Sequence, residues 1–151
     1  MKIIKPLDRI PLGGKIVFLA GSIEMGTAEN WQNKVEKLLE DTDWIILNPR
    51  RDDWDSSWEQ SIENREFYEQ VNWELRGLEM SDMAIMYFAP GTKSPISLLE
   101  FGLLAGSEPG KLLVVCPEGF WRKGNVDIVC ERYFIKQFNT IEMAVERLRE
   151  M

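Results

Sequence analysis

Short apolar runs recur along the chain and are separated by longer, more polar segments. The runs are rich in β-branched residues, and a strand buried on both faces has this composition. The clear runs are residues 15–20 (KIVFLA), 44–47 (WIIL), 83–88 (MAIMYF) and 111–116 (KLLVVC), with a fifth strand expected near 133–135. The pattern therefore predicts about five buried β-strands.

Between the runs, apolar positions follow the spacing of amphipathic helices. The predicted helices are residues 30–40, 61–80, 96–105 and 140–149. Ser94-Pro95 is typical of a helix start, with serine as the N-cap and proline at the first helical position. The polar, proline-broken segment 48–58 and residues 120–125 are expected to be loops.

Strands that alternate with helices predict an α/β fold in which helices cover both faces of a parallel sheet. The length of 151 residues suits a single domain spanning residues 1–151. Ligands of such sheets bind at the carboxyl ends of the strands. Here those ends are Gly21-Ser22, residues 48–54, residues 89–94 and the segment from Pro117 onward.

Composition narrows the possible chemistry. The sequence contains no histidine, so Ser-His-Asp and Cys-His catalysis and histidine-ligated metal sites are excluded. The formal net charge of −7 and the lack of a basic stripe argue against a nucleic acid polymer as partner. No apolar run approaches the roughly 18 residues of a membrane span, and residues 1–14 do not resemble a secretory signal. Cys116 and Cys130 lack metal-like spacing, and we expect reduced core thiols in a cytoplasmic protein.

Glu100 is the most informative residue of the sequence. It lies in ISLLEFGLLA, a predicted helix that is apolar nearly all round. A carboxylate buried there is costly without a partner. The Glu100 carboxylate could instead form hydrogen bonds with backbone groups at the end of a helix, or it could reach solvent between its apolar neighbours. Because the helix starts at the ligand-binding edge, Glu100 is also a candidate nucleophile or base with a raised pKa.

Two further carboxylates, Glu74 and Asp82, could converge with Glu100 on one cleft. Glycosidic chemistry uses such sets, in which one carboxylate attacks the anomeric carbon and another handles a proton on the leaving group. Glu74 could equally lie on a solvated helix face. For Asp82 a contact at a helix end or strand start is favoured.

Two loops carry candidate binding groups. Gly21-Ser22-Ile23, followed by Gly26, could present backbone N–H groups and a hydroxyl to a phosphate or sugar. The second loop contains the cluster Arg50, Arg51, Asp53 and Trp54, where Trp54 or the earlier Trp31 could stack on a base. Each loop could also be purely structural.

Taken in order, these segments resemble the successive motifs of the nucleoside 2-deoxyribosyltransferase-like family over nearly the whole chain. The motifs are Leu19-Ala20-Gly21-Ser22-Ile23, Asn48-Pro49-Arg50-Arg51 with Trp54, Gln70-Val71-Asn72-Trp73-Glu74, Ser81-Asp82, Pro95-Ile96-Ser97-Leu98-Leu99-Glu100-Phe101-Gly102 and Asn125-Val126. The resemblance implies a flavodoxin-like fold and a double displacement without a cofactor.

The resemblance also implies roles for individual residues. The family's nucleophilic glutamate matches Glu100, and the acidic residue that contacts the base matches Glu74. Ser94 replaces a sugar-binding aspartate, as in relatives that hydrolyse 2-deoxynucleoside monophosphates, where the serine helps bind phosphate. Gly21-Ser22-Ile23 resembles the same branch. Phe18 replaces a tyrosine that orients the nucleophile, and Asn125 matches an asparagine that reaches a neighbouring subunit's site, which implies a homo-oligomer.

Three functions remain open at this point. The first is transfer of a 2-deoxyribosyl group from a 2-deoxynucleoside to a free nucleobase. The second is hydrolysis of the N-glycosidic bond of a (deoxy)nucleoside monophosphate by the same residues. The third belongs to a different class, a non-catalytic module that senses nucleotides on this fold.

Overall fold

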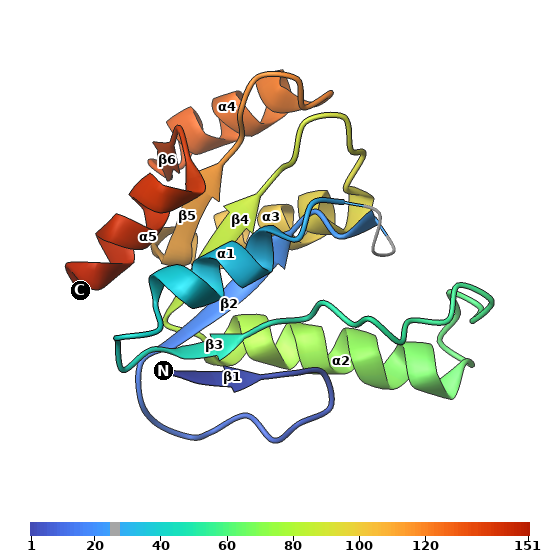
Figure 1. Cartoon of the computed structure of the whole chain (residues 1–151). Helices are drawn as coiled ribbons and strands as arrows, with labels where there is room; N and C mark the ends of the chain where they lie inside the picture. Colours follow the sequence, from blue (N-terminus) through green and yellow to red (C-terminus); the bar gives the residue numbers. More distant parts are fainter. Residues whose placement is uncertain (25–27) are drawn as a thin grey trace.

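A parallel β-sheet with helices on both faces forms the protein (Figure 1). The computed structural model describes residues 1–24 and 28–151. Within these ranges the strands are β1 (Lys2–Ile4), β2 (Ile16–Gly21), β3 (Ile45–Leu47), β4 (Met83–Tyr87), β5 (Leu112–Val115) and β6 (Lys136–Phe138). The helices are α1 (Trp31–Leu38), α2 (Arg65–Met80), α3 (Pro95–Ser107), the short 3₁₀ helix η2 (Pro109–Lys111), α4 (Lys123–Arg132) and α5 (Ile141–Arg149).

The strand order is β1-β3-β2-β4-β5-β6, and every pairing between these described strands is parallel. Apart from β1, this is the doubly wound order of a flavodoxin-like fold, which confirms the predicted fold class. After β2 the chain adds β3 on one side of this strand, and it then adds β4, β5 and β6 on the other side. The topological switch point therefore lies between the carboxyl ends of β2 and β4.

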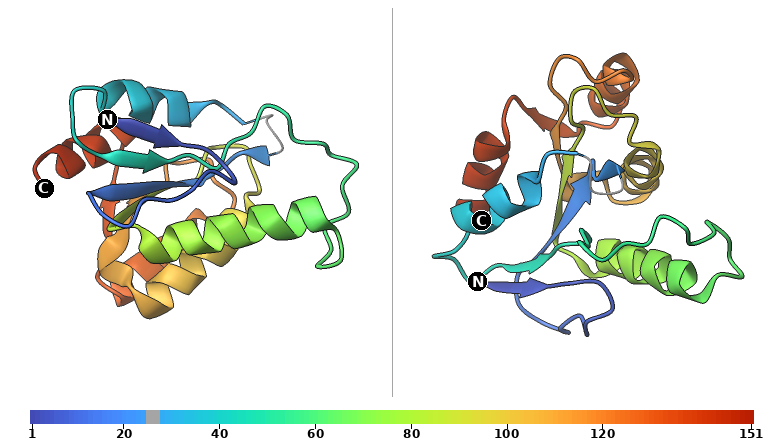
Figure 2. Two further views of the ribbon diagram at one scale, coloured as in Figure 1. Left: turned by 90° about the horizontal axis from the view of Figure 1, so that it is seen from below. Right: turned by 45° about the vertical axis from the view of Figure 1, so that its right-hand side comes forward.

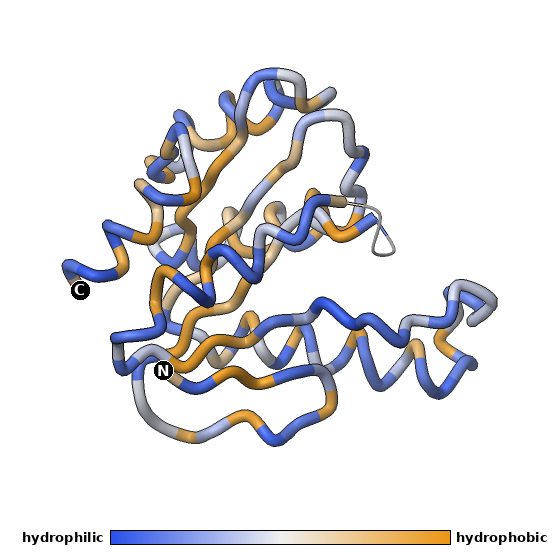
Figure 3. The backbone as a smooth tube through the Cα atoms, in the orientation of Figure 1, coloured by the Kyte–Doolittle hydropathy of each residue, from blue (hydrophilic) through white to orange (hydrophobic). Residues whose placement is uncertain are grey.

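Two hydrophobic cores lie on the two faces of the sheet because successive strand residues point in opposite directions. Phe18, Ala20, Ala84 and Met86 pack on the face covered by α2, α3 and α4, whose buried residues join the same core. The alternate residues of the same strands pack against α1 and α5. Figure 2 (right) shows these two layers of helices on either side of the sheet, and Figure 3 shows the apolar central strands.

Several helices begin where the sequence supplies a side-chain cap. The side chains of Asn30, Asn64 and Thr140 accept hydrogen bonds from the backbone N–H groups three residues later, at 3.0–3.2 Å. Each bond satisfies one of the N–H groups that a helix leaves unpaired at its start. Asn64 therefore starts α2 at Arg65, later than the predicted start at residue 61.

One strand was not predicted, and two predicted details were wrong. Residues Lys2–Ile4 form β1, which pairs with β3 at the edge of the sheet. The last strand is 136–138 rather than 133–135, because Phe134 adopts φ +55° in the turn after α4. Residues 123–125 belong to α4 rather than to a loop.

The described helices include none that is both long and apolar enough to cross a membrane.

Candidate active site

Helices α2 and α3 bring two acidic side chains together on one face of the sheet. Glu100 lies in the second turn of α3, and Glu74 lies on α2. The negative charge of Glu74 is one of the two causes that raise the pKa of Glu100, so the two carboxyl groups interact electrostatically. The two residues that were expected to converge thus lie close enough to interact, and their catalytic roles remain a prediction.

Glu100 is buried, with 9% of its surface exposed. Its Oε2 atom is buried and has no hydrogen-bond partner among the described residues. Burial raises the pKa of Glu100 to about 8, with a further contribution from the charge of Glu74. Such a carboxyl group is poorly solvated when ionised, which favours reaction with an electrophilic carbon or capture of a proton.

Glu74 is partly buried and is held by the residue one helical turn earlier. The Gln70 side-chain amide donates a hydrogen bond to Glu74 Oε1 at 2.7 Å. Burial raises the pKa of Glu74 to about 7, although the hydrogen bond from Gln70 acts in the opposite direction. Because Oε1 accepts this bond, a proton on Glu74 resides on Oε2. Near neutral pH, Glu74 can therefore both give and take a proton.

Arg51 fixes the orientation of the Gln70 amide. Its Nη1 donates to Gln70 Oε1 at 3.4 Å, while Nε and Nη2 each donate to the Asp53 carboxylate at 3.0 Å. The carbonyl end of Gln70 thus faces Arg51, and its NH₂ end faces Glu74. The sequence predicted Arg51 and Asp53 but missed Gln70, although its i,i+4 spacing to Glu74 was visible.

Three hydroxyl groups form a cluster at the carboxyl ends of β2 and β4. Ser22 Oγ lies 2.6 Å from Ser94 Oγ and 3.0 Å from Thr92 Oγ1, and these last two lie 2.8 Å apart. Ser22 Oγ also accepts a hydrogen bond from the Ala89 N–H at 2.9 Å. The sequence predicted Ser22 and Ser94 but not Thr92.

Ser94 occupies the predicted N-cap position but does not cap α3 through its side chain. Its backbone is left-handed, with φ +47°, and its hydroxyl makes no capping hydrogen bond. The hydroxyl instead bonds within the cluster. The capping role that the Ser94-Pro95 pattern predicted is therefore wrong, whereas the proline at the start of the helix is confirmed.

Gly21 allows the chain to turn sharply at the end of β2. It adopts φ +143°, and a Cβ atom there would lie 2.3 Å from the Tyr87 carbonyl oxygen. A side chain is therefore excluded by a backbone contact. The next residues, Ser22 and Ile23, follow directly, but the predicted Gly26 lies outside the described residues.

The aromatic candidates have different environments. Trp31 is completely buried and donates its indole N–H to the Ser22 carbonyl oxygen at 3.0 Å, so it cannot stack on a base as the sequence suggested. Phe18 is also completely buried, in contact with Trp73 at a ring distance of 6.2 Å. Trp54 is only partly buried and contacts Trp58, a residue that the sequence analysis missed, edge to face at 5.0 Å.

Asp82 lies at the opposite end of the sheet. Its Oδ2 accepts a hydrogen bond from the Ile16 N–H at 2.8 Å, at the start of β2. This contact joins the amino ends of two strands and matches the strand-start role that was favoured for Asp82. It separates Asp82 from the Glu74–Glu100 pair, so the three carboxylates do not share one cleft.

Asn125 is exposed in the first turn of α4. Cys116 and Cys130 are buried free thiols, and burial raises the pKa of both. Residues 1–24 and 28–151 contain no group of three or more Cys, Asp or Glu side chains placed to hold a metal ion.

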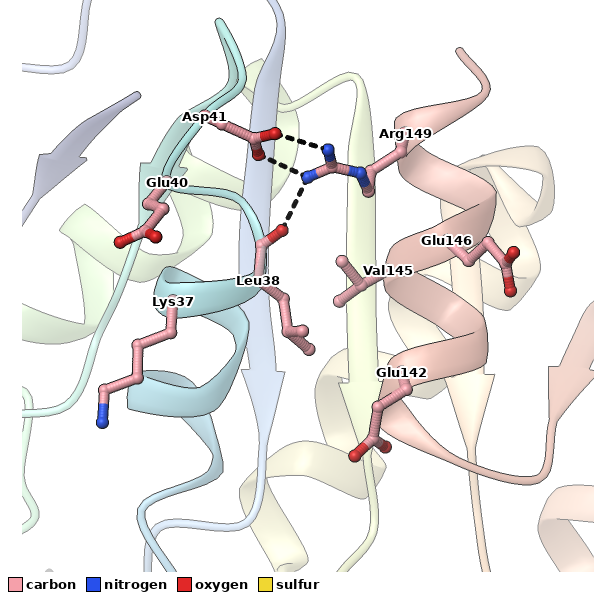
Figure 4. Close-up of a pocket in the computed structure, with 8 residues that line it drawn as sticks. All are labelled: Lys37, Leu38, Glu40, Asp41, Glu142, Val145, Glu146 and Arg149. Atoms are coloured by element: carbon pink, nitrogen blue, oxygen red, sulfur yellow. Dashed lines mark hydrogen bonds and ion pairs between the residues drawn. The ribbon is translucent and has the colours of Figure 1, made fainter.

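Two cavities lie outside the carboxylate pair. One, of about 580 Å³, lies between α1 and α5, where Arg149 and Asp41 bind each other (Figure 4). The other, of about 520 Å³, lies beside the switch point. It is lined by Glu24, Ala28, Glu29, Tyr87, Ala89, Pro90, Gly91 and Thr92.

Comparison with known families gives one match. A family model described as "Nucleoside 2-deoxyribosyltransferase like" matches residues 14–120, which is more than half of the chain. The matched segment includes Glu74, Ser94 and Glu100, while Asn125 lies beyond it. A search of curated proteins found no match.

Proposed function

The chain belongs to the nucleoside 2-deoxyribosyltransferase-like family, and we propose that it transfers a 2-deoxyribosyl group between nucleobases. The observation that carries this proposal is the pair of carboxyl groups of Glu100 and Glu74. Both pKa values are raised by burial, and the two groups interact. Two carboxyl groups whose pKa values are raised toward neutral pH suit a reaction with one nucleophile and one acid–base group.

In the proposed first step, ionised Glu100 attacks C1′ of a 2-deoxynucleoside. The bond from C1′ to the base nitrogen breaks, its electron pair stays on the base, and Glu74 supplies the proton that the base takes up. A glutamyl ester of the sugar remains. In the second step another base attacks C1′, gives its proton to Glu74 and releases the Glu100 carboxylate.

The raised pKa values have a consequence for this mechanism. Burial raises the pKa of both carboxyl groups toward neutral pH, so a proton can reside on either group in the free protein. The reactive form needs that proton on Glu74 and an anionic Glu100. Positive charge that develops at C1′ beside Glu100 stabilises its anion and therefore favours the reactive form during the reaction.

The surrounding residues support a nucleoside in this position. The Arg51–Gln70 contact orients Glu74, and the partly buried Trp54 offers an aromatic face to a base. In the cluster of hydroxyls formed by Ser22, Thr92 and Ser94, Thr92 lines the cavity and offers a partner for sugar oxygens. The same hydroxyls are the observation that favours the second candidate, hydrolysis of a nucleoside monophosphate, because they could also bind phosphate.

Base exchange tests the proposed function. Purified protein is incubated with a 2-deoxynucleoside and a different free base, and both nucleosides are followed by chromatography. We expect exchange, and a preference for deoxynucleosides over ribonucleosides of at least about a hundredfold in kcat/KM. The 2-hydroxyl of ribose withdraws electrons and disfavours the oxocarbenium-like transition state. Free sugar without exchange would indicate the hydrolase, and no base release from nucleosides or monophosphates would indicate the sensing module.

We also propose a homo-oligomer in which Asn125 contributes to a neighbouring site. Support comes from an exposed apolar stripe on α3, formed by Ile96, Leu99 and Leu103. Helix α4, which carries Asn125, covers the same face of the sheet. Symmetric association of two copies would cover this stripe and create two equal sites.

Mixing two inactive variants, Glu100→Ala and Asn125→Ala, tests this arrangement. Under subunit exchange, a mixed dimer holds one site in which both residues are intact, so about a quarter to a half of the wild-type activity should return. Sedimentation of the wild-type protein should show a dimer or higher oligomer. Absence of recovery despite proven exchange would assign Asn125 to its own subunit or to no catalytic role.

A further inference from the structure

The start of α3 is occupied by a carboxylate from a distant part of the chain. Glu24 Oε1 accepts hydrogen bonds from the backbone N–H groups of Ser94, at 2.6 Å, and Lys93, at 3.0 Å. These are the last two residues before α3 begins at Pro95. Glu24 thus joins the segment after β2 to the segment after β4 across the switch point.

Two converging backbone N–H groups at the N-terminus of a helix form a position that binds anions. Helix α3 is 13 residues long, and its axial dipole adds positive potential there. The hydroxyls of Ser22, Thr92 and Ser94 lie beside it. A phosphate from solution would accept hydrogen bonds from the same two N–H groups, which already donate to the Glu24 carboxylate.

The charges around this position also disfavour a second anion. The neighbouring cavity is lined by Glu24 and Glu29, and the described residues that line it include no lysine or arginine. Lys93 Nζ and the Arg122 guanidinium lie 4.2 and 4.4 Å from the centre of the Trp121 ring. The Arg50 guanidinium donates hydrogen bonds to the backbone carbonyl oxygens of Ala28 and Glu29. A phosphate beside the Glu24 carboxylate would therefore meet repulsion.

We infer that Glu24 determines specificity by selecting a sugar with free hydroxyl groups and excluding a phosphorylated one. This inference rests on the proposed function, with Glu100 as the nucleophile. Ser94 and Glu100 are six positions apart along the start of α3, which corresponds to a rise of about 9 Å. A sugar whose C1′ faces Glu100 can therefore extend its far oxygens toward the start of α3. There a hydroxyl can donate to the Glu24 carboxylate, whereas a phosphate cannot.

Kinetics with matched substrates test the inference. For wild-type protein we expect kcat/KM for base release to be at least about tenfold higher on a 2-deoxynucleoside than on its monophosphate. Glu24→Ala removes both the charge and the bulk, and should shift this ratio toward the monophosphate by roughly ten- to a hundredfold. Glu24→Gln removes the charge but still fills the position, so an intermediate shift is expected. Glu79→Gln makes the same chemical change at an exposed position of α2 that does not line this cavity, and it should shift the ratio less than about threefold.

Binding of inorganic phosphate separates this inference from the proposed function, because it needs no turnover. Titration calorimetry should detect phosphate binding to Glu24→Ala at least about tenfold tighter than to wild type. If phosphate binds the variant but no substrate reacts with either protein, the proposed function fails and the role of Glu24 at this position stands. Equal phosphate affinity in both folded proteins, or a wild-type preference for monophosphates, would overturn the inference. If Glu24→Ala does not fold, Glu24→Gln carries both measurements.

Discussion

Glu100→Gln should lower the rate of base release by at least about a thousandfold while the protein stays folded. The amide has nearly the size of the carboxyl group, so the packing of α3 is retained. It cannot form the ester with C1′ that the proposed double displacement needs. Single-turnover rates on a 2-deoxynucleoside, together with the circular dichroism spectrum of the variant, measure both parts of this prediction.

Glu79→Gln is the matched control, because it makes the same chemical change at an exposed position of α2. It should retain wild-type rates. Rapid denaturation of wild-type protein during turnover should also trap the sugar on the peptide that contains Glu100, and mass spectrometry should find no such adduct in Glu100→Gln. A variant with more than a tenth of the wild-type rate would remove Glu100 from the role of nucleophile.

The central part of the fold could be predicted because its signals are local. The runs that became β2, β4 and β5 are continuous and apolar, since both faces of these strands are covered. The alternation with helices then fixed the carboxyl ends as the candidate site. Elements with little burial were missed because they lack such a continuous apolar pattern. Helix α4 buries only Val126 and Cys130, and most of β1 is exposed.

A residue of the candidate site could be predicted only where its type was unusual within its own segment of the sequence. Glu100 stood out as a carboxylate in an apolar helix, and the structure places it in a buried position with an unpaired oxygen atom. The contact of Glu24 with Ser94 joins residues seventy positions apart, and no local pattern reveals such a pairing. The opposite placements of Glu74 and Asp82 depend on tertiary structure in the same way.

The unpaired oxygen of Glu100 also bears on stability. The pKa of Glu100 is raised from 4.5 to about 8 in the folded protein, so the folded state holds a proton that the unfolded state has released. Between these two values the folded state binds more protons, and stability therefore falls as pH rises. Below about pH 4.5 this cost is absent, and above about pH 8 it is fully present.

Glu100→Gln should therefore gain stability relative to wild type as pH rises from 5 to 9. The shift in pKa corresponds to a difference of at most about 5 kcal/mol between the two pH limits, and a gain of several kcal/mol is expected. Urea unfolding at pH 5, 7 and 9 measures the free energy of unfolding for both proteins. Any constant cost of the buried amide cancels when the difference between variant and wild type is compared across pH.

Glu142→Gln provides a control of opposite sign. The hydrogen bond from Lys34 is the main cause that lowers the pKa of Glu142. This group stabilises the folded state above its unfolded pKa, so its substitution should lose nearly the same stability at pH 5, 7 and 9. The loss should disappear only when pH falls below the lowered pKa of the folded carboxyl group. If the difference between Glu100→Gln and wild type does not change with pH, the Glu100 carboxyl group must be ionised without cost in the folded protein. Its burial could then not be the source of its reactivity.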